Sequence, residues 1–339
     1  MTELYRSARS VSAQRVGVAV VGCGEIAKAH LSALRRLETA RLRATVDVDA
    51  ERAKRAAEAS GAEVYYAGVE DALGDPAVDA CILCLPHHLH KPVALQAARA
   101  GKHVLVEKPM ALSLDEALEM VAAAEEHGVR LMVGHVLRFR AHNRKVYELL
   151  RSGAIGEPLS FVRRRYLYSR SLERAPWAAD PARSGGRLLY DLGPHEYDLL
   201  LWLAGSRAKR VFALGRVNNP AWQSPDEILS VIELDGGSIA SVTLSLNSHT
   251  GVWDQFVFGT EGSIFADNRT IVLNGQEVAP GAGAGNGILS EDAEFIAAIL
   301  EGREPEASGR NVLRTMALLD AVRASMTSGQ EVQVVQVGD

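Results

Sequence analysis

Three short segments of the sequence combine residue types that bind nucleotides or move protons. The first is the G-x-G-x-x-A run Gly22-Cys23-Gly24-Glu25-Ile26-Ala27. Two glycines let the backbone approach a pyrophosphate, and the free N–H groups of a helix N-terminus favour its negative charge. Asp47 ends the next predicted strand, where a carboxylate can accept both ribose hydroxyls of NAD and would repel the extra phosphate of NADP. The pattern favours NAD; the alternative is a tight turn without a ligand.

The second segment is Glu107-Lys108-Pro109, which follows the apolar run Val104–Val106. Ligands of parallel sheets bind at the carboxyl edge of the strands, where Lys108 would stand. Its ammonium could donate a hydrogen bond to a reacting oxygen. It could instead accept the proton itself if burial lowers its pKa. A solvated surface lysine is the ordinary alternative.

The third segment contains Asp191, His195 and Asp198, spaced by four and three residues, so that on a helix all three share one face. Oxidising a secondary alcohol requires a base near neutral pKa, and histidine supplies one. The ordinary alternative is a capping aspartate beside a histidine of the core.

The run Gly101–Pro109 closely resembles the Gfo/Idh/MocA family of glucose-fructose oxidoreductase and inositol dehydrogenase. Leu85–His90 is similar to that family's T-P-N-x-x-H segment, with Leu85 and His87 in place of Thr and Asn. Gly185–Asp198 is similar to its G-G-x-x-x-D-x-G-x-H-x-x-D signature, and the resemblance extends over the whole chain. It implies a Rossmann domain joined to an α/β domain with a large open sheet.

The same resemblance implies a catalytic trio of Lys108, Asp191 and His195, with His195 as general base and Asp191 binding the substrate or orienting the imidazole. The predicted cofactor contacts are Gly22, Cys23, Gly24, Glu25, Ile26, Asp47, Leu85, Pro86, His88, His90, Glu107 and Lys108. The predicted substrate contacts are the catalytic trio together with Arg138, Arg163, Arg165, Tyr168, Trp177 and Tyr190, and Tyr166 and Arg187 are further candidates. The irregular segment 169–184 is a candidate substrate-covering loop.

Strands alternate with helices through the first part of the chain, which predicts a doubly wound parallel sheet. We assign it to residues 1–140 as an NAD-binding domain, with the first 14 residues frayed. The predicted strands are Val16–Val21, Leu42–Val46, Ala80–Leu85, Val104–Val106 and Arg130–Val133. The predicted helices are Ile26–Leu37, Glu51–Ser60, His90–Ala100 and Ser113–His127.

Residues 141–339 change to longer alternating segments, which predict a substrate and oligomerisation domain with a large open, mainly antiparallel sheet. The strands are Leu159–Tyr168, Arg210–Asn218, Ile228–Leu234, Ser238–Leu246 and Val252–Phe258, and the helices are Gly186–Ala204, Glu291–Leu300 and Asn311–Met326. The glycine-rich segment 281–287 is predicted to be a mobile loop. An exposed sheet face predicts a homodimer or homotetramer.

Composition excludes several classes of partner. The 339 residues carry a formal net charge of -5 and no long basic run, which argues against nucleic acid. The sequence contains neither a run of 18 apolar residues nor a signal-peptide core, which predicts a cytoplasmic protein without membrane contact. Cys23, Cys81 and Cys84 are odd in number, which argues against a disulfide framework. The C-x-x-C pair lies in an apolar strand, so we expect core packing and no metal.

Taken together, the residues and the resemblance predict an NAD-dependent oxidoreductase that transfers hydride to or from a secondary ring hydroxyl or ketone of a sugar, cyclitol or aminoglycoside-like substrate. One alternative is an NAD-dependent glycosidase of the same fold that uses transient oxidation. Another is a non-catalytic sensor of nucleotide or sugar. Lys108, Asp191 and His195 argue against a sensor, which has no need of proton-transfer groups.

Overall fold

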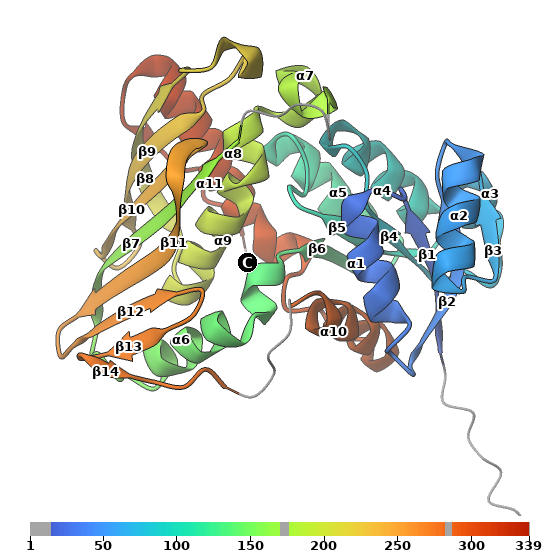
Figure 1. Cartoon of the computed structure of the whole chain (residues 1–339), viewed down its shortest axis with the longest axis horizontal. Coiled ribbons are helices and arrows are strands. Elements are labelled where there is room, and N and C mark those ends of the chain that lie inside the picture. The colour runs from blue at the N-terminus through green and yellow to red at the C-terminus, as the bar shows by residue number, and fades with distance from the viewer. Residues whose placement is uncertain (1–14, 170–175, 282–286, 339) are drawn as a thin grey trace, which may run out of the picture.

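The computed structural model describes residues 15–169, 176–281 and 287–338, which form two lobes side by side (Figure 1). Three predicted features fall wholly or partly outside those ranges. They are the frayed residues 1–14, the middle of the candidate covering loop (170–175) and most of the glycine-rich segment (282–286).

The first lobe is a six-stranded parallel sheet with strand order β3-β2-β1-β4-β5-β6, so the predicted doubly wound domain is confirmed. Its strand order reverses between β1 and β4, where ligands of such sheets bind. The strands are β1 (Val16–Val21), β2 (Ala40–Val46), β3 (Val64–Tyr66), β4 (Ala80–Leu83), β5 (His103–Glu107) and β6 (Leu131–Gly134). The helices are α1 (Glu25–Leu34), α2 (Ala50–Ser60), α3 (Val69–Gly74), α4 (His90–Arg99) and α5 (Leu114–Glu126).

Local sequence explains why these elements begin and end where they do. Every residue of β1 is buried, as its continuous apolar run predicts for a central parallel strand. The Asp49 side chain caps α2 by accepting from the Arg52 N–H, and Ser113 caps α5 by accepting from the Glu116 N–H. Gly61 ends α2 with φ of 76°, a left-handed conformation that costs glycine little.

The second lobe contains a nine-stranded sheet in the order β14-β13-β12-β11-β7-β10-β9-β8-β15. All its neighbouring strands are antiparallel except β7 and β10, so the predicted mainly antiparallel sheet is confirmed. Its strands are β7 (Pro158–Tyr168), β8 (Ala208–Arg216), β9 (Glu227–Leu234), β10 (Ile239–Ser245), β11 (Asn247–Gly259), β12 (Ser263–Asp267), β13 (Ile271–Leu273), β14 (Gln276–Glu277) and β15 (Val332–Gln333).

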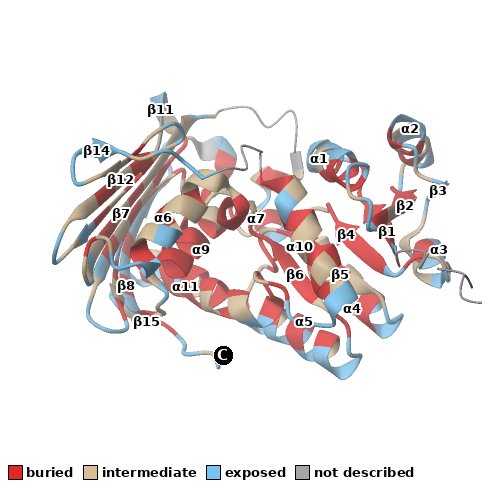
Figure 2. Ribbon diagram, turned by 90° about the horizontal axis from the view of Figure 1, so that it is seen from below, coloured by how far each residue is buried: buried red, intermediate tan, exposed pale blue. Residues whose placement is uncertain are grey.

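Helices cover one face of the large sheet, which we call its inner face. Figure 2 shows α6 (Ala141–Arg151), α9 (Gly193–Ala204) and α11 (Gly309–Ser328) on that side, with exposed residues along the strands opposite. Phe161 and Arg163 of β7 are buried on the inner face, whereas Val162 and Arg164, which point to the other face, are only partly buried. This alternation confirms the predicted strand.

The predicted single helix from Gly186 to Ala204 is wrong at its centre. The chain forms α8 (Arg187–Asp191) and α9, which follow the four-residue helix α7 (Pro181–Ser184). Pro194 lacks the N–H that a continuous helix would donate to the Tyr190 carbonyl, and its ring would clash with that carbonyl. The chain therefore breaks at Leu192, and Asp191 and His195 stand on two helices rather than on one face.

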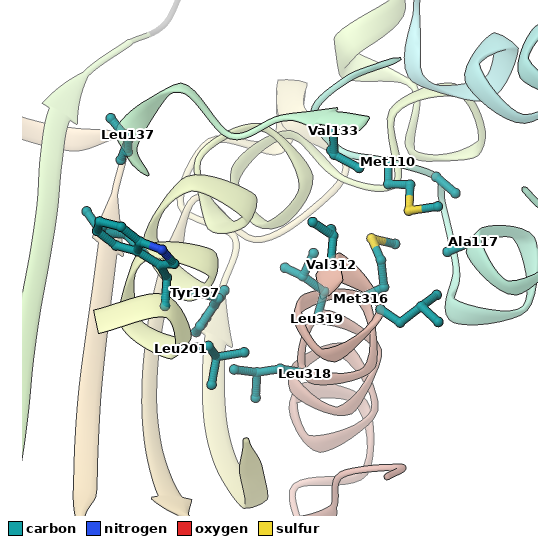
Figure 3. Close-up of a cluster of buried hydrophobic side chains, with 14 of the residues drawn as sticks. Met110, Ala117, Val133, Leu137, Tyr197, Leu201, Val312, Met316, Leu318 and Leu319 are labelled. Carbon is teal, nitrogen blue, oxygen red and sulfur yellow. The ribbon is translucent and has the colours of Figure 1, made fainter. Parts of the chain in front are cut away.

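The two C-terminal helices join the lobes. Helix α11 contacts α5 and β6 of the first lobe and α9 and β8 of the second. Figure 3 shows its side chains Met316 and Leu318 lying between Met110 on one side and Leu201 on the other. Helix α10 (Ile288–Glu301) returns to the first lobe and packs against α1 through Phe295 and its neighbours. The lobes consequently share buried apolar surface.

In the described part of the chain, no helix is both long and apolar enough to cross a membrane.

We expect Leu319→Ala to lower the free energy of unfolding by about 2–5 kcal/mol, because Leu319 is fully buried on α11 and its loss leaves a cavity. Leu118→Ala, at a position 41% exposed on α5, is the matched control and should change it by about 0.5 kcal/mol. Urea unfolding followed by circular dichroism measures both. Equal decreases in the free energy of unfolding for the two variants would show that Leu319 of α11 does not contribute to the core shared by the lobes.

Candidate active site

The lysine and aspartate motifs meet between the two lobes. Lys108, which follows β5, donates from Nζ to the Asp191 carbonyl oxygen at 3.0 Å and to Asp191 Oδ1 at 2.8 Å. Arg187 Nη1 pairs with the other carboxylate oxygen at 2.5 Å. Although burial opposes ionisation, the charges of Lys108 and Arg187 hold the pKa of Asp191 well below its usual range. Asp191 is therefore a permanent counter-ion that fixes the position of the Lys108 ammonium.

His195 lies in the first turn of α9, close to this ion pair. Burial, followed by the charge of Lys108, lowers the pKa of His195 well below the usual value. Its imidazole is thus neutral at neutral pH, the state in which it can accept a proton. The side-chain hydrogen bonds described for Asp191 go to Lys108 and Arg187 rather than to the imidazole. Asp191 thus positions the lysine.

The predicted phosphate turn joins β1 to α1 and has the shape that a pyrophosphate requires. Gly22 has φ of 89°, and a Cβ there would stand 2.3 Å from the Cys84 carbonyl oxygen. Gly24 precedes α1 without a side-chain cap, and a Cβ there would meet no atom within 4 Å. The open space over Gly24 and the uncapped helix N-terminus fit a bound phosphate. The side chains of Glu25 and Ile26 are exposed beside this turn.

Asp47 stands where the ribose of a dinucleotide would lie. Its Oδ2 accepts from the Cys23 N–H and its Oδ1 from the Asp49 N–H, both at 2.9 Å. Arg52 approaches Oδ1 at 3.3 Å. A cavity of about 350 Å³ beside the turn is lined by residues that include Cys23, Gly24 and Arg52. The carboxylate is therefore oriented by backbone before any ligand arrives.

Leu85, Pro86 and His88 follow β4 and are half-buried at the same edge of the sheet, where they can reach a cofactor. His90 and Glu107 were also predicted as cofactor contacts, and the structure places both side chains in buried hydrogen-bond networks. The His90 ring is fully buried between the carbonyl oxygens of Pro109 at 2.7 Å and Leu85 at 2.9 Å. It braces the backbone on either side of Lys108 instead of contacting the cofactor.

Glu107 belongs to a buried polar cluster behind Lys108. Its Oε2 accepts from the Lys108 N–H at 3.1 Å, and its Oε1 lies 3.2 Å from Nε2 of His30 on α1. His30 Nδ1 lies 2.8 Å from Asp292 Oδ1 on α10. Burial alone would lower the pKa of His30, but the Asp292 and Glu107 carboxylates outweigh it and hold that pKa well above its usual value. Glu107 thus supports the lysine from inside the core.

Glu291 completes this cluster with two carboxylate oxygens that are buried without a hydrogen-bond partner. Burial and the nearby Glu107 charge raise its pKa well above the usual value, which favours the neutral acid. His30, Glu107 and Glu291 bring one potential ligand atom each within 4.8 Å of one another, which makes this cluster the place in the described ranges where a cation could bind. Protons on His30 and Glu291 can balance the negative charge of the buried carboxylates in the same way as a bound cation.

Arg138 and Tyr190 were predicted to contact the substrate, and both are instead buried structural residues. Arg138 is 1% exposed and binds Asp198 at 2.8 and 2.5 Å, so the third residue of the motif is part of an inter-lobe ion pair. Tyr190 is fully buried and donates to Asp320 Oδ1 at 2.9 Å. A hydroxyl or guanidinium held in this way is closed to a ligand.

Tyr168 was also predicted to contact the substrate. Alternation along β7 turns its side chain to the outer face, where it stacks on His249 with ring centroids 4.0 Å apart. Arg163 and Arg165 lie on the inner face, and Arg163 is bound to Glu196. Trp177 packs edge-on against His87 at 4.7 Å between centroids. Arg163, Arg165 and Trp177 remain candidates for substrate contact.

Two residues that the sequence analysis did not select lie close to these candidates. Arg140 and Trp253 line a cavity of about 530 Å³ on the inner side of the large sheet. Trp253 is the cross-strand partner of Arg165. The alternating pattern of β11 could have placed Trp253 on the inner face, but the pairing with Arg165 depends on strand register.

A Rossmann sheet with an open phosphate turn, joined to a second lobe that supplies an aspartate and a histidine to a lysine, defines a dinucleotide-dependent oxidoreductase. Comparison with known families agrees. Residues 16–135 match the oxidoreductase family with an NAD-binding Rossmann fold, and residues 143–265 match the GFO/IDH/MocA C-terminal domain. The chain therefore belongs to the GFO/IDH/MocA family, and it is an NAD-dependent oxidoreductase.

Relatives of known name cover most of the chain. An uncharacterised oxidoreductase, YrbE of Bacillus subtilis, is 33% identical over 261 residues, which cover 75% of this chain and 74% of YrbE. The myo-inositol 2-dehydrogenase of Thermotoga maritima is 28% identical over 337 residues, covering 94% of this chain and 99% of that enzyme. Among solved structures, GenD2 from gentamicin A biosynthesis, in complex with NAD, has a TM-score of 0.86 at 28% identity over 96% of this chain and 98% of GenD2.

We expect Glu291→Gln to change how stability depends on pH. A raised folded-state pKa contributes stability that is present below the unfolded pKa and is lost as pH rises toward the folded value. Glutamine mimics the neutral acid without titrating. The free energy of unfolding of the variant should therefore rise relative to that of the wild type by about 1.4 kcal/mol per pH unit above about pH 5. Urea unfolding at several pH values measures this difference. Glu58→Gln, at an exposed position on α2, should follow the wild type, and parallel curves for Glu291→Gln and wild type would contradict the assignment.

Proposed function

We propose that this oxidoreductase moves a hydride between NAD and a secondary ring carbinol or ketone carbon of a sugar or cyclitol. The observation that carries the proposal is the Lys108–Asp191 ion pair beside a neutral His195 at the junction of the two lobes. The T. maritima relative is a myo-inositol 2-dehydrogenase, which supports a cyclitol or sugar as the substrate class, and GenD2 from gentamicin A biosynthesis was solved with NAD, which supports the cofactor.

Bound NAD supplies the hydride acceptor or donor. Lys108 is ion-paired with Asp191, so it donates a hydrogen bond from Nζ to the reacting oxygen and stabilises its alkoxide-like form. A ring nitrogen of His195 accepts the hydroxyl proton during oxidation and returns it during reduction. Arg187 holds the second oxygen of Asp191, which keeps that carboxylate from taking the proton.

We expect Lys108→Met to lower kcat by about 10²–10³-fold, because it removes a donor aimed at developing negative charge. NAD affinity should change little, since the phosphate turn and Asp47 lie elsewhere. Absorbance at 340 nm with a panel of cyclitols, hexoses and sugar acids measures the rate, and calorimetry measures NAD binding. Lys91→Met, which removes a surface pair with Glu119, is the control and should retain activity.

Two outcomes would contradict the proposed reaction. Release of an aglycone from glycosides with no net change at 340 nm would indicate the NAD-dependent glycosidase. Tight binding of NAD and sugars with neither reaction would indicate a sensor.

We also propose a homodimer or homotetramer formed through the outer face of the large sheet. Apolar side chains that alternate with buried ones support it: Leu214 is 58% exposed on β8, Leu229 and Val231 are 50% and 58% exposed on β9, and Ile239 is 54% exposed on β10. A contiguous exposed apolar patch of this kind is typical of a protein interface.

Val231→Lys should reduce the mass measured by light scattering after gel filtration to that of a monomer, because a lysine charge opposes burial of this face. Leu118→Lys on α5 introduces the same charge away from the sheet and should leave the mass unchanged. A wild-type monomer, or an unchanged oligomer for Val231→Lys, would contradict this interface.

A reducing cytoplasmic compartment is the last part of the proposal. Cys23, Cys81 and Cys84 are free and buried, and burial raises the pKa of the Cys81 and Cys84 thiols to about 12. They act as core residues, as the apolar strand predicts.

A further inference from the structure

Two arginines lie over one tryptophan on the inner face of the large sheet. The Cζ atom of Arg165 is 4.2 Å from the centre of the Trp253 ring, and that of Arg140 is 4.4 Å from it. Arg165 and Trp253 are cross-strand partners on β7 and β11, and Arg140 directly precedes α6. We call these three residues the arginine–tryptophan cluster.

Neighbouring acids are already engaged by other cations. Glu196 binds Arg163 at 2.5 Å, and Asp191 is shared by Lys108 and Arg187. Asp254 binds Arg164 at 2.5 Å, one residue before Arg165 along β7.

As a result, within residues 15–169, 176–281 and 287–338 no carboxylate forms an ion pair with Arg165 or Arg140. The Nε atom of Arg140 is buried without a hydrogen-bond partner. Burial lowers the pKa of both guanidinium groups, and the charge of Arg165 lowers the pKa of Arg140 further. Glu196 and Asp191 offset part of this effect from a distance. Two partly buried cations that repel each other and have no carboxylate in direct contact favour the binding of an anion.

The cluster lies between the catalytic residues and a cavity. Arg165 is close enough to His195 for its charge to help lower the pKa of that imidazole. Arg140 and Trp253 line the cavity of about 530 Å³, together with His142 and Asn143 at the start of α6. A cavity of this size is typical of a small-molecule site.

We propose that Arg165 and Arg140 bind an anionic group, a carboxylate or a phosphate, on the sugar-like substrate while its carbinol carbon faces Lys108 and His195. The inference rests on the proposed function and narrows its substrate class to sugar acids and sugar phosphates. It also opposes the aminoglycoside-like substrates included in the sequence prediction, because their ammonium groups would face uncompensated arginines. Planar guanidinium groups suit either anion, since both present oxygens to a fork of N–H donors.

The test compares matched substrates on the NAD-loaded enzyme. Glucuronate and galacturonate represent carboxylates, glucose 6-phosphate represents phosphates, and glucose, galactose and glucosamine are the neutral and cationic references. We expect kcat/KM for at least one anionic class to exceed that of its neutral parent by about 10–100-fold, and glucosamine to be the poorest substrate. The better of the two anionic classes identifies which group the cluster binds.

Variants assign that preference to the cluster. Arg165→Gln should lower kcat/KM for the preferred anion by about 10–100-fold more than for its neutral parent, mainly through KM. Arg165→Lys keeps the charge and should recover part of the loss. Arg164→Gln, one residue earlier and bound to Asp254, is the matched control and should leave the preference unchanged.

A binding measurement separates this inference from the proposed reaction. Quenching of tryptophan fluorescence by each sugar, in wild type and in Lys108→Met, reports binding without turnover. Anion binding that depends on Arg165 in a protein that oxidises no sugar would support the site and reject the reaction. Neutral sugars that bind and react as well as their anionic counterparts would overturn the inference and leave the reaction standing.

Discussion

The ion pair between Lys108 and Asp191 is the contact on which the site depends, because its two halves come from different lobes. Lys108 is placed by the end of a buried parallel strand, and Asp191 by a five-residue helix that ends at a proline-induced break. Neither element can fix the distance alone. Helix α11 does so by filling the space between the lobes, and the buried Arg138–Asp198 pair fixes the middle of α9 against the first lobe. Apolar packing therefore sets the geometry of a polar site.

Behind the lysine, the protein accepts a second group of buried charges. Glu107, His30 and Asp292 form a chain from β5 through α1 to α10, and Glu291 lies beside it as a neutral acid. Buried ionic groups stabilise little compared with apolar residues of the same volume, so a cluster of this kind is explained better by positioning than by stability. It holds the backbone of the residue that must meet the substrate, and it connects that residue to a helix from the far end of the chain.

Sequence patterns predicted those parts of the molecule whose structure is set by residues close to them in the sequence. The apolar run of β1, the glycine turn and the helices α2 and α5 are local, and the structure agrees with them. Sequence could not show that four polar residues predicted to contact a ligand have buried partners, because tertiary packing sets those partners; they are Arg138, Tyr190, His90 and Glu107. Asp198 lies 60 residues from Arg138, and Asp320 lies 130 residues from Tyr190. Pro194 was visible in the sequence, and weighting it above the helical spacing would have placed the break correctly.

The charges of the site divide into two groups with different consequences. Lys108, Arg187 and Arg163 each have a carboxylate in the folded protein, so their positions are settled before a ligand binds. Arg165 and Arg140 form no ion pair among the described residues, and Glu196 and Asp191 act on them only from a distance. Compensated charges suit catalysis, because a group that is already oriented needs no reorganisation when charge develops on the substrate. Charges without an ion-paired partner suit substrate selectivity. A substrate that lacks the complementary anionic group leaves the arginines unpaired in the complex, and this free-energy cost weakens the binding of the wrong substrate but not of the right one.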